Sequence, residues 1–300
     1  MANYGVEFMQ PTERSIGTSS LRVGPISYGC WRFAGTTVDD AAAKINAALD
    51  HNMTLIDTAD IYGSRGPDGF GSSEALLGEV LRASPGLRDR CVIATKGGIR
   101  PGTPYDSTRA YLLAACDDSL RRLGIDTIDL YQIHRPDLAT HPAEVAATLG
   151  ELVETGKVRY VGVSNYNSAQ LDALLAHAEI PIVSSQPEFS LWFHEPIDDG
   201  TLDRAMQHRL TPLAWSPLGR GAVGDATSPL GTLLCELATE YDTTPTAIAL
   251  AWIMAHPSAP IPIIGTQQVE RIAEAATATS VALSRADWYR LLATAGRALP

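Results

Sequence analysis

The sequence predicts a single (β/α)8 TIM barrel that carries a small N-terminal hairpin and occupies residues 1–300 as one domain. First, short β-branched or apolar segments alternate with amphipathic helical segments along the whole chain, as in parallel sheets with helical crossovers. Second, eight such strand segments can be counted, which is the number that closes this kind of barrel. Third, no Pro/Gly/Ser-rich linker divides the 300 residues, and α/β barrels fill about 250 residues as one unit.

The predicted strands follow the hairpin at regular intervals. They span residues 26–30, 54–59, 91–96, 127–134, 158–164, 182–186, 211–216 and 261–265. The segments between them place apolar residues three and four positions apart, which is typical of amphipathic helices. Asp39 and Ser107 are predicted N-caps, and Gly124 and Gly156 are predicted to follow the final turns of two helices.

A doubly wound dinucleotide-binding fold is the main alternative architecture. Residues 219–224 match the pattern G-x-G-x-x-G after a predicted strand. That fold needs an Asp or Glu about 20 residues later, but residues 243–245 are Thr-Thr-Pro. The match is therefore interpreted as a decoy for that fold. Two interpretations of the glycine loop stay open, a flexible connection and a close backbone approach to a phosphate.

The composition predicts a cytoplasmic protein. With 23 Lys and Arg against 34 Asp and Glu, the net charge is −11, which argues against a nucleic-acid partner. The first fifteen residues lack the features of a signal peptide, and no stretch reaches the roughly 18 apolar residues of a membrane helix. Neither a membrane partner nor a bound metal is predicted, and a monomer is the expectation. Four scattered cysteines, Cys30, Cys91, Cys116 and Cys235, are expected to be reduced core residues.

Ionisable residues follow three of the predicted strands. Asp57, Lys96 and His134 stand at the ends of the second, third and fourth strands, and Tyr62 comes five residues after Asp57. Each residue alone has an ordinary structural explanation, such as a cap, a solvated strand end or a satisfied core histidine. Because the carboxyl ends of barrel strands meet at one mouth, the four together predict a catalytic site.

These four side chains suit the reduction of a carbonyl group. Asp57 would hold Lys96, and the Lys96 ammonium would lower the pKa of the Tyr62 phenol. Tyr62 would then give a proton to the developing alkoxide while neutral His134 hydrogen-bonds the same oxygen. Since no side chain supplies a hydride, the chemistry implies a nicotinamide cofactor.

Six motifs at the strand ends carry a family resemblance. They are DTADIYG at 57–63, TK at 95–96, DLYQIHRPD at 129–137, GKVRYVGVSN at 156–165, AWSPLGRG at 214–221 and PIIGTQQVERIAEA at 262–275. On these motifs the chain resembles the aldo-keto reductases over essentially its whole length. It is most similar to bacterial oxidoreductases of about this size. The resemblance places Asp57, Tyr62, Lys96 and His134 at the family's catalytic positions, with Tyr62 as general acid.

The resemblance also implies a cofactor, NADPH, with NADH as the second possibility. Ser164, Asn165 and Gln186 would hold the carboxamide, and Trp215 would stack on the nicotinamide, where the family often has Tyr. The other implied cofactor positions are Gly29, Cys30, Trp31, Asp57, Ser216, Leu218, Gly219, Gly221, Gly265, Thr266, Gln267, Arg271 and Glu274. Many members carry a Lys in the adenosine segment, where this chain has Gln267 and Gln268, so Arg271 is the evident cation for a 2′-phosphate.

The substrate is predicted to be a small carbonyl compound in an apolar pocket. Its predicted walls are Trp31, Phe33, Tyr62, Tyr105, His134 and Trp192, with Phe193 beside the last. Only about fifteen residues follow the expected helix start at 284–287, so an open mouth is expected. Two alternative functions remain, a cofactor-binding auxiliary subunit with slow turnover and a Schiff-base aldolase that uses Lys96.

Overall fold

A computed structural model describes residues 12–299 and shows a closed barrel of eight parallel strands. The strands are β3 (Ser27–Gly29), β4 (Leu55–Asp57), β5 (Val92–Gly97), β8 (Ile128–Ile133), β9 (Val158–Ser164), β10 (Ile182–Gln186), β11 (Thr211–Ala214) and β12 (Ile261–Ile264). Each pairs with the next in parallel, and β12 pairs with β3 to close the ring. The predicted barrel is thereby confirmed, and each observed strand lies within or close to its predicted range. A doubly wound open sheet is excluded.

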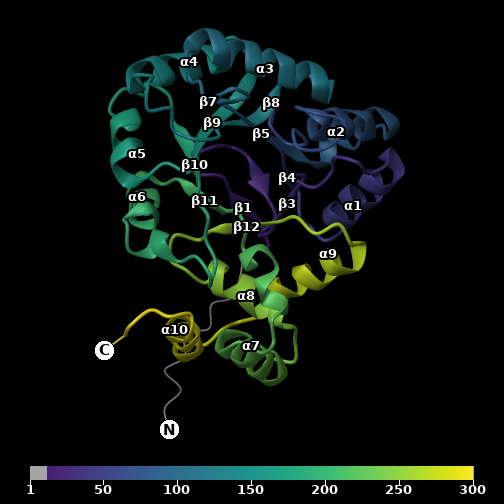
Figure 1. Cartoon of the computed structure of the whole chain (residues 1–300), viewed down its shortest axis with the longest axis vertical. Helices are drawn as coiled ribbons and strands as arrows, with labels where there is room; N and C mark the ends of the chain where they lie inside the picture. The colour runs from purple at the N-terminus through teal and green to yellow at the C-terminus, as the bar shows by residue number, and fades with distance from the viewer. Residues whose placement is uncertain (1–11, 300) are drawn as a thin grey trace.

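Helices surround the barrel on all sides (Figure 1). They are α1 (Val38–Asp50), α2 (Ser72–Ala83), α3 (Arg109–Leu123), α4 (Pro142–Glu154), α5 (Ser168–Leu175), α6 (Thr201–His208), α7 (Pro229–Glu240), α8 (Pro245–Met254), α9 (Val269–Ala276) and α10 (Arg285–Thr294). Short 3-10 segments lie at η1 (Arg88–Arg90), η2 (Glu195–Ile197), η3 (Gly219–Gly224) and η4 (Thr277–Ser280), and η3 is kinked at Arg220 and Gly221. Within residues 12–299, none of the helices has the length and apolar character needed to cross a membrane.

The helix ends agree only partly with the sequence signals. Gly124 caps the end of α3 in the left-handed conformation, and Gly156 follows α4 with φ of 74°, as predicted. The two predicted N-caps are wrong by one or two residues. Thr37 caps α1 and accepts a hydrogen bond from the Asp40 N–H, whereas Thr108 precedes α3 without a side-chain cap.

Helix α8 is the exception to the amphipathic pattern, because eight of its residues are buried on all sides. The crossover between β11 and β12 contains both α7 and α8, and α10 packs beside them (Figure 1). The indoles of Trp252 in α8 and Trp288 in α10 stack with their centroids 5.2 Å apart, and each donates to the other's main-chain oxygen. A second helical layer thus covers α8, which explains its uniformly apolar sequence.

The N-terminal hairpin closes one end of the barrel. Strands β1 (Arg14–Ser15) and β2 (Arg22–Val23) pair antiparallel, and Ile16, Leu21 and Val23 pack on apolar side chains inside the barrel. The hairpin lies across the centre of the ring in Figure 1. Because it plugs the amino-terminal ends of the strands, a ligand would enter from the carboxyl-terminal end, which is the end toward the viewer in Figure 1.

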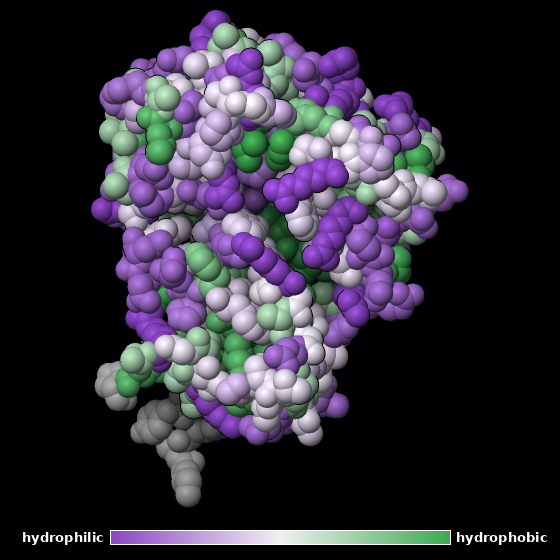
Figure 2. All heavy atoms as spheres, viewed as in Figure 1, coloured by the Kyte–Doolittle hydropathy of each residue, from purple (hydrophilic) through white to green (hydrophobic). Residues whose placement is uncertain are grey.

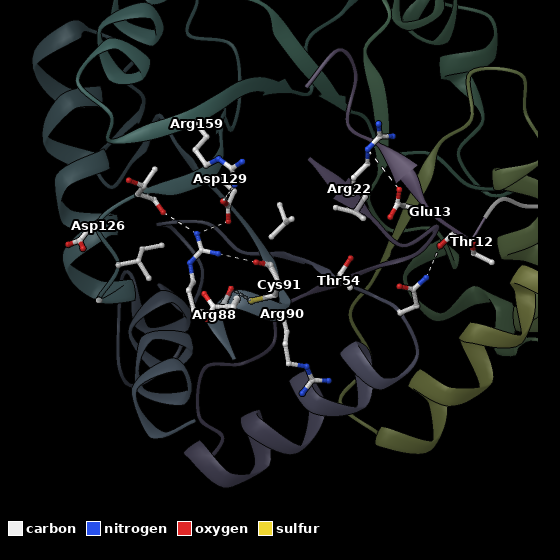
Figure 3. Close-up of a pocket in the computed structure, with 17 residues that line it drawn as sticks. Thr12, Glu13, Arg22, Thr54, Arg88, Arg90, Cys91, Asp126, Asp129 and Arg159 are labelled. Carbon is white, nitrogen blue, oxygen red and sulfur yellow. Dashed lines mark hydrogen bonds and ion pairs between the residues drawn. The ribbon is translucent and has the colours of Figure 1, made fainter. Parts of the chain in front are cut away.

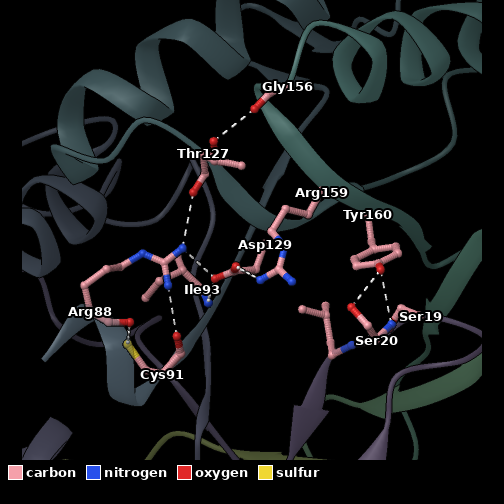
Figure 4. A network of polar contacts seen from close by, with 11 residues as sticks. Ser19, Ser20, Arg88, Cys91, Ile93, Thr127, Asp129, Gly156, Arg159 and Tyr160 are labelled. Carbon is pink, nitrogen blue, oxygen red and sulfur yellow. Dashed lines mark hydrogen bonds and ion pairs between the residues drawn. The ribbon is translucent and has the colours of Figure 1, made fainter.

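A polar cavity of about 960 Å³ lies beside this plug, between the hairpin and the starts of β5, β8 and β9 (Figure 3). The buried carboxylate of Asp129 organises its wall (Figure 4). It forms an ion pair with Arg88 at 2.7 Å, and it accepts hydrogen bonds from Arg159 at 2.9 Å and from the main-chain N–H of Ile93 at 2.8 Å. Arg88 also donates to the main-chain oxygens of Cys91 and Thr127. This network joins three neighbouring strands at the end opposite to the predicted catalytic site.

Three of the four cysteines lie in the core as expected, namely Cys30, Cys91 and Cys116, and all four are free thiols. Cys235 is exposed, so its assignment to the core was wrong. It lies on the outer side of α7, a helix whose other side packs against α8.

Candidate active site

The four predicted catalytic residues meet at the carboxyl-terminal ends of β4, β5 and β8. Asp57 is the last residue of β4, Lys96 lies one residue before the end of β5, and His134 follows β8 directly. The His134 N–H donates to the Gly97 oxygen at 2.8 Å, which holds the histidine beside β5. Tyr62 lies in the turn after β4. At the start of this turn, the main-chain N–H groups of Thr58 and Asp60 donate hydrogen bonds to main-chain oxygens of β5.

Lys96 is fully buried and uses all three of its N–H donors. Its ammonium lies 2.7 Å from Asp57 Oδ2, 2.7 Å from the Thr58 main-chain oxygen and 3.3 Å from the Tyr62 hydroxyl oxygen. An ammonium has three donors and no acceptor, so the Tyr62 oxygen must accept in this contact. The Tyr62 O–H is therefore left free to donate to another group.

The second oxygen of the Asp57 carboxylate is also occupied. Gln186, the last residue of β10, donates its side-chain N–H to Asp57 Oδ1 at 3.0 Å. Strands β4 and β10 lie opposite each other in the ring, so this hydrogen bond crosses the barrel interior. Asp57 is thus held from both sides and keeps the orientation that the buried ammonium needs.

Burial and charge act against each other on the two proton-bearing groups. Burial alone lowers the pKa of Lys96, but Asp57 and Tyr62 outweigh it, and the pKa lies above its ordinary value. Burial raises the pKa of Tyr62 more than the Lys96 ammonium lowers it. Lys96 therefore acts in the predicted direction, but the expected net lowering of the Tyr62 pKa was wrong. At neutral pH Lys96 is charged and Tyr62 is protonated.

His134 is neutral at physiological pH. Burial, followed by the positive charges of Lys96 and Arg135, lowers its pKa well below the ordinary value. Its ring meets that of Tyr62 edge to face with centroids 5.7 Å apart. The ring nitrogen Nδ1 is buried and has no hydrogen-bond partner within residues 12–299. A neutral imidazole therefore lies beside the free phenol proton.

A cluster of amide and hydroxyl groups lies next to this quartet. The Ser164 hydroxyl donates to the Gln186 main-chain oxygen at 2.9 Å and accepts from Asn165 Nδ2 at 2.8 Å. Asn165 Nδ2 also donates to the His134 main-chain oxygen at 3.1 Å, and Asn165 Oδ1 accepts from the Trp215 indole N–H at 3.0 Å. The structure thus brings together all four residues that were assigned to the nicotinamide.

The loop after β11 supports Trp215 from another side. The Arg220 guanidinium lies over the Trp215 ring, 5.6 Å from its centroid, and makes two hydrogen bonds to the Glu188 carboxylate. Ser216, Gly219, Arg220 and Gly221 all have positive φ.

Trp192 packs closely on this loop. A Cβ on Gly219 would lie 2.5 Å from the Trp192 ring, so only glycine fits there. Leu218 precedes the turn and is partly buried. Trp192 therefore contacts the loop predicted to bind the cofactor, in addition to any substrate that it walls.

The predicted adenosine segment follows β12, the neighbour of β11. Gly265, Thr266 and Gln267 are partly exposed in the connection to α9, and the Tyr28 hydroxyl donates to the Thr266 oxygen at 2.9 Å. Arg271 is exposed on α9, and within residues 12–299 its guanidinium has no ion-pair partner. Glu274 lies one turn later on the same helix. Arg271 is thus available to an anionic group.

The predicted substrate-pocket residues fall into two groups. Trp31 is 60% exposed after β3, and Tyr105 is 37% exposed in β7 (Thr103–Tyr105), which pairs with β6 (Ile99–Arg100). Phe33 is instead fully buried and packs on Tyr28 with centroids 5.9 Å apart, so its assignment to the pocket wall is corrected to the core.

The surface view from the same side shows a hollow at the centre of the barrel (Figure 2). Hydrophilic side chains surround the opening, and apolar residues line its depth (Figure 2). Gly29 and Cys30 are buried in the barrel wall beneath Trp31. The end of the barrel that carries the quartet is thus open in the described part of the chain.

The aldolase alternative conflicts with the state of Lys96. Imine formation needs a neutral amine with a free lone pair. The Lys96 nitrogen is protonated and donates in three directions, and its pKa is raised. The geometry therefore disfavours the Schiff-base function.

Three features of this region were not foreseen. The Glu188–Arg220 pair joins two loops that are 32 residues apart, and a single sequence contains no signal for such a pairing. The sequence likewise gives no signal that the Thr58 main-chain oxygen accepts a hydrogen bond from Lys96. Asp60 did have a signal, because the motif 57–63 contains a second aspartate. It is fully buried, and burial followed by the charge of Glu74 raises its pKa well above the ordinary value.

The chain is similar in sequence to known proteins over nearly its whole length. The sequence profile described as the Aldo/keto reductase family matches residues 25–294. The chain is 47% identical to the 6-dehydroglucose reductase of Novosphingobium aromaticivorans over 97% of its own length and 98% of that protein. It is 37% identical to the 6-dehydroglucose reductase of Agrobacterium fabrum, over 91% and 95% of the two chains.

A solved structure shows the same similarity in three dimensions. A thermostable aldo-keto reductase, crystallised with the inhibitor epalrestat, superposes with a TM-score of 0.82 at 27% identity. The match covers 94% of this chain and 99% of that protein.

Proposed function

The chain belongs to the aldo/keto reductase family and is an oxidoreductase, and from this premise we propose that it reduces a sugar aldehyde to a primary alcohol with NADPH. The observation that carries the proposal is the hydrogen-bond count at Lys96. All three ammonium donors are engaged, and one of them is directed at the Tyr62 oxygen. A carbonyl oxygen at the mouth would therefore meet a phenol whose proton is free.

A nicotinamide cofactor held by Ser164, Asn165, Gln186 and Trp215 would supply the hydride that reduces the carbonyl carbon. Tyr62 donates its proton to the carbonyl oxygen as that atom gains negative charge, so a C–H bond and an O–H bond form and the C=O double bond becomes single. Lys96 stabilises the resulting phenolate, and Asp57 keeps Lys96 charged. Neutral His134 hydrogen-bonds the same oxygen and orients the substrate. In the reverse direction the Tyr62 phenolate accepts the proton of an alcohol.

The cofactor proposal rests on chemical fit. Gln186 keeps one free amide N–H and Asn165 Oδ1 keeps one lone pair after their internal bonds, which suits the acceptor and donor of a carboxamide. Trp215 offers an aromatic face at the same place. Arg271, with no ion-pair partner within residues 12–299, suits the 2′-phosphate that distinguishes NADPH from NADH.

The proposed substrate is a hexose whose C6 carries an aldehyde. Two relatives with high coverage are named for the reduction of 6-dehydroglucose, and the aromatic rings of Trp31 and Tyr105 stand exposed at the mouth. Aromatic faces with polar neighbours suit the mixed apolar and hydroxylated faces of a sugar ring. The same opening would admit other small aldehydes with lower efficiency.

The test is a direct assay of reduction. Purified protein is mixed with 6-dehydroglucose and either NADPH or NADH, and the absorbance of the reduced nicotinamide is followed together with the formation of glucose. Glucose in place of 6-dehydroglucose is the control, because it lacks the C6 aldehyde. We expect turnover with 6-dehydroglucose and NADPH, slower turnover with NADH, and little with glucose. Absence of cofactor oxidation with all aldehydes tested would contradict the proposed function.

A further inference from the structure

Asn165 has a backbone conformation that needs support. Its φ is 59°, in the left-handed region that residues other than glycine seldom adopt. Its main-chain N–H donates to the Gln186 oxygen at 3.1 Å, and its side chain contacts Ser164, His134 and Trp215. Asn165 is therefore held in this conformation by hydrogen bonds of its side chain, one of which joins it to the His134 main chain.

The Trp215 indole determines which way the Asn165 amide faces. An indole N–H can only donate, so the atom 3.0 Å away must be the amide oxygen. At the other end, the His134 main-chain oxygen can only accept, so the atom 3.1 Å away must be the amide nitrogen. The two contacts agree, and both N–H donors of the Asn165 amide are occupied by protein groups.

We propose that Trp215 is a positioning residue whose indole N–H, and not only its aromatic face, holds Asn165 and the His134 main chain in the arrangement that receives the nicotinamide carboxamide. The inference rests on the proposed use of NADPH. The ring is held independently by the Arg220 guanidinium over it, and the Trp215 main chain is held by a parallel β-bridge to Glu188. The indole N–H therefore links the loop after β11 to Asn165 after β9, and the Asn165 amide continues this link to His134 after β8.

A double-mutant cycle separates the N–H from the aromatic face. Trp215→Phe keeps an aromatic ring but removes the donor, and Asn165→Gly removes the acceptor while tolerating positive φ. The readout is the dissociation constant of NADPH by titration calorimetry. With Asn165 present, we expect Trp215→Phe to weaken NADPH binding about tenfold, the upper range for one hydrogen bond plus the loss of ring area. In the Asn165→Gly background the same change should cost about twofold or less.

A second readout uses the protein without cofactor. Hydrogen exchange of the Asn165 main-chain N–H reports how firmly its bond to Gln186 is held. We expect Trp215→Phe to accelerate this exchange about tenfold. The matched control is Trp288→Phe, which removes an indole N–H bonded to a main-chain oxygen far from the mouth and should leave the Asn165 exchange unchanged. Unfolding midpoints of all variants confirm that they are folded.

The outcomes are decisive in both directions. Equal effects of Trp215→Phe in the two backgrounds, or unchanged exchange at Asn165, would overturn the positioning role. If Trp215→Phe does not fold, Trp215→Tyr, which also keeps an aromatic ring and lacks the indole N–H, replaces it in both measurements with the same expected effects. If the unchanged protein does not bind NADPH, the proposed function fails, whereas the exchange measurement still decides whether the indole holds Asn165.

Discussion

Replacing Tyr62 with Phe tests the proposed proton donor directly, because it removes one hydroxyl and keeps the ring that packs against His134. The Lys96 ammonium donates to the Tyr62 oxygen at 3.3 Å, and its other donors are directed at Asp57 and Thr58. In the variant no phenol proton remains, and Lys96 keeps two of its three partners. The protein should therefore fold normally and lose mainly the transfer of a proton to the carbonyl oxygen.

The expected loss is large. General acid catalysis contributes about 100-fold to 10,000-fold, which corresponds to about 2.7 to 5.4 kcal/mol of transition-state stabilisation. Because the Tyr62 hydroxyl lies outside the amide cluster around Asn165, the dissociation constant of NADPH should change by about twofold or less. The proposed role of Tyr62 requires its protonated form. Because the pKa of Tyr62 is raised, the unchanged enzyme keeps that form through neutral pH. Its reduction rate should be flat there and fall only as pH rises past the raised pKa.

Single-turnover measurements make the test sharp. Enzyme is loaded with NADPH and mixed with aldehyde, and the absorbance of the reduced nicotinamide is followed in a stopped-flow instrument, so that product release does not mask the chemical step. The control is Tyr131→Phe, which also removes a buried hydroxyl but one without a hydrogen-bond partner within residues 12–299. A single-turnover rate for Tyr62→Phe within about tenfold of the unchanged enzyme would refute the proton-donor role.

Three further changes test other parts of the molecule. Arg271→Ala should raise the KM for NADPH about tenfold and leave that for NADH unchanged in steady-state assays, because one ion pair to the 2′-phosphate is lost; equal rises would place the phosphate elsewhere. Asp129→Ala should lower the free energy of unfolding in urea by about 3 kcal/mol, since two arginines and one buried N–H lose their acceptor, and a loss below about 1 kcal/mol would contradict this. Asp60→Asn should gain stability relative to the unchanged protein as pH rises from about 4 toward neutrality. Burial and the charge of Glu74 raise the Asp60 pKa, although the charge of Arg122 acts in the opposite direction, so the folded state retains a proton that the unfolded state releases. If the stabilities of the variant and the unchanged protein instead differ by the same amount at every pH, Asp60 does not titrate in this way.

The barrel and the meeting of Asp57, Tyr62, Lys96 and His134 at one end of it could be predicted from the sequence because both depend on local patterns. Alternating strand and helix periodicity defines the eight β–α units, and in a barrel the strand ends converge whatever the loops do. Asp57, Lys96 and His134 are therefore brought together by topology alone. The N-caps were less predictable, because Thr37 and Asp39 are both good caps and only the geometry of the first turn selects between them.

The remaining errors concern burial and pairing, which a single sequence does not encode. Phe33 follows the first barrel strand as an exposed wall residue would, yet it turns inward onto Tyr28. The net pKa of Tyr62 depends on how far burial outweighs one neighbouring ammonium, and only the packed structure gives that balance. The Gln186–Asp57 bond joins residues 129 positions apart and depends on the tilt and register of opposite strands.

The hydrogen bond from Gln186 to Asp57 connects the two halves of the proposed site. A continuous chain of contacts runs from the Trp215 indole through Asn165 and Ser164 to Gln186, and the Gln186 side chain continues it across the barrel to Asp57. From Asp57 it passes through the Lys96 ammonium to the Tyr62 oxygen. The groups proposed to hold the nicotinamide and the groups proposed to deliver the proton are thus parts of one hydrogen-bonded network. Because buried networks of this kind hold their members in fixed orientations, changes at Gln186 or Asp57, which lie between the two sides, should alter both cofactor binding and proton transfer. A change at Tyr62, which ends the chain of contacts, should leave the cofactor side intact.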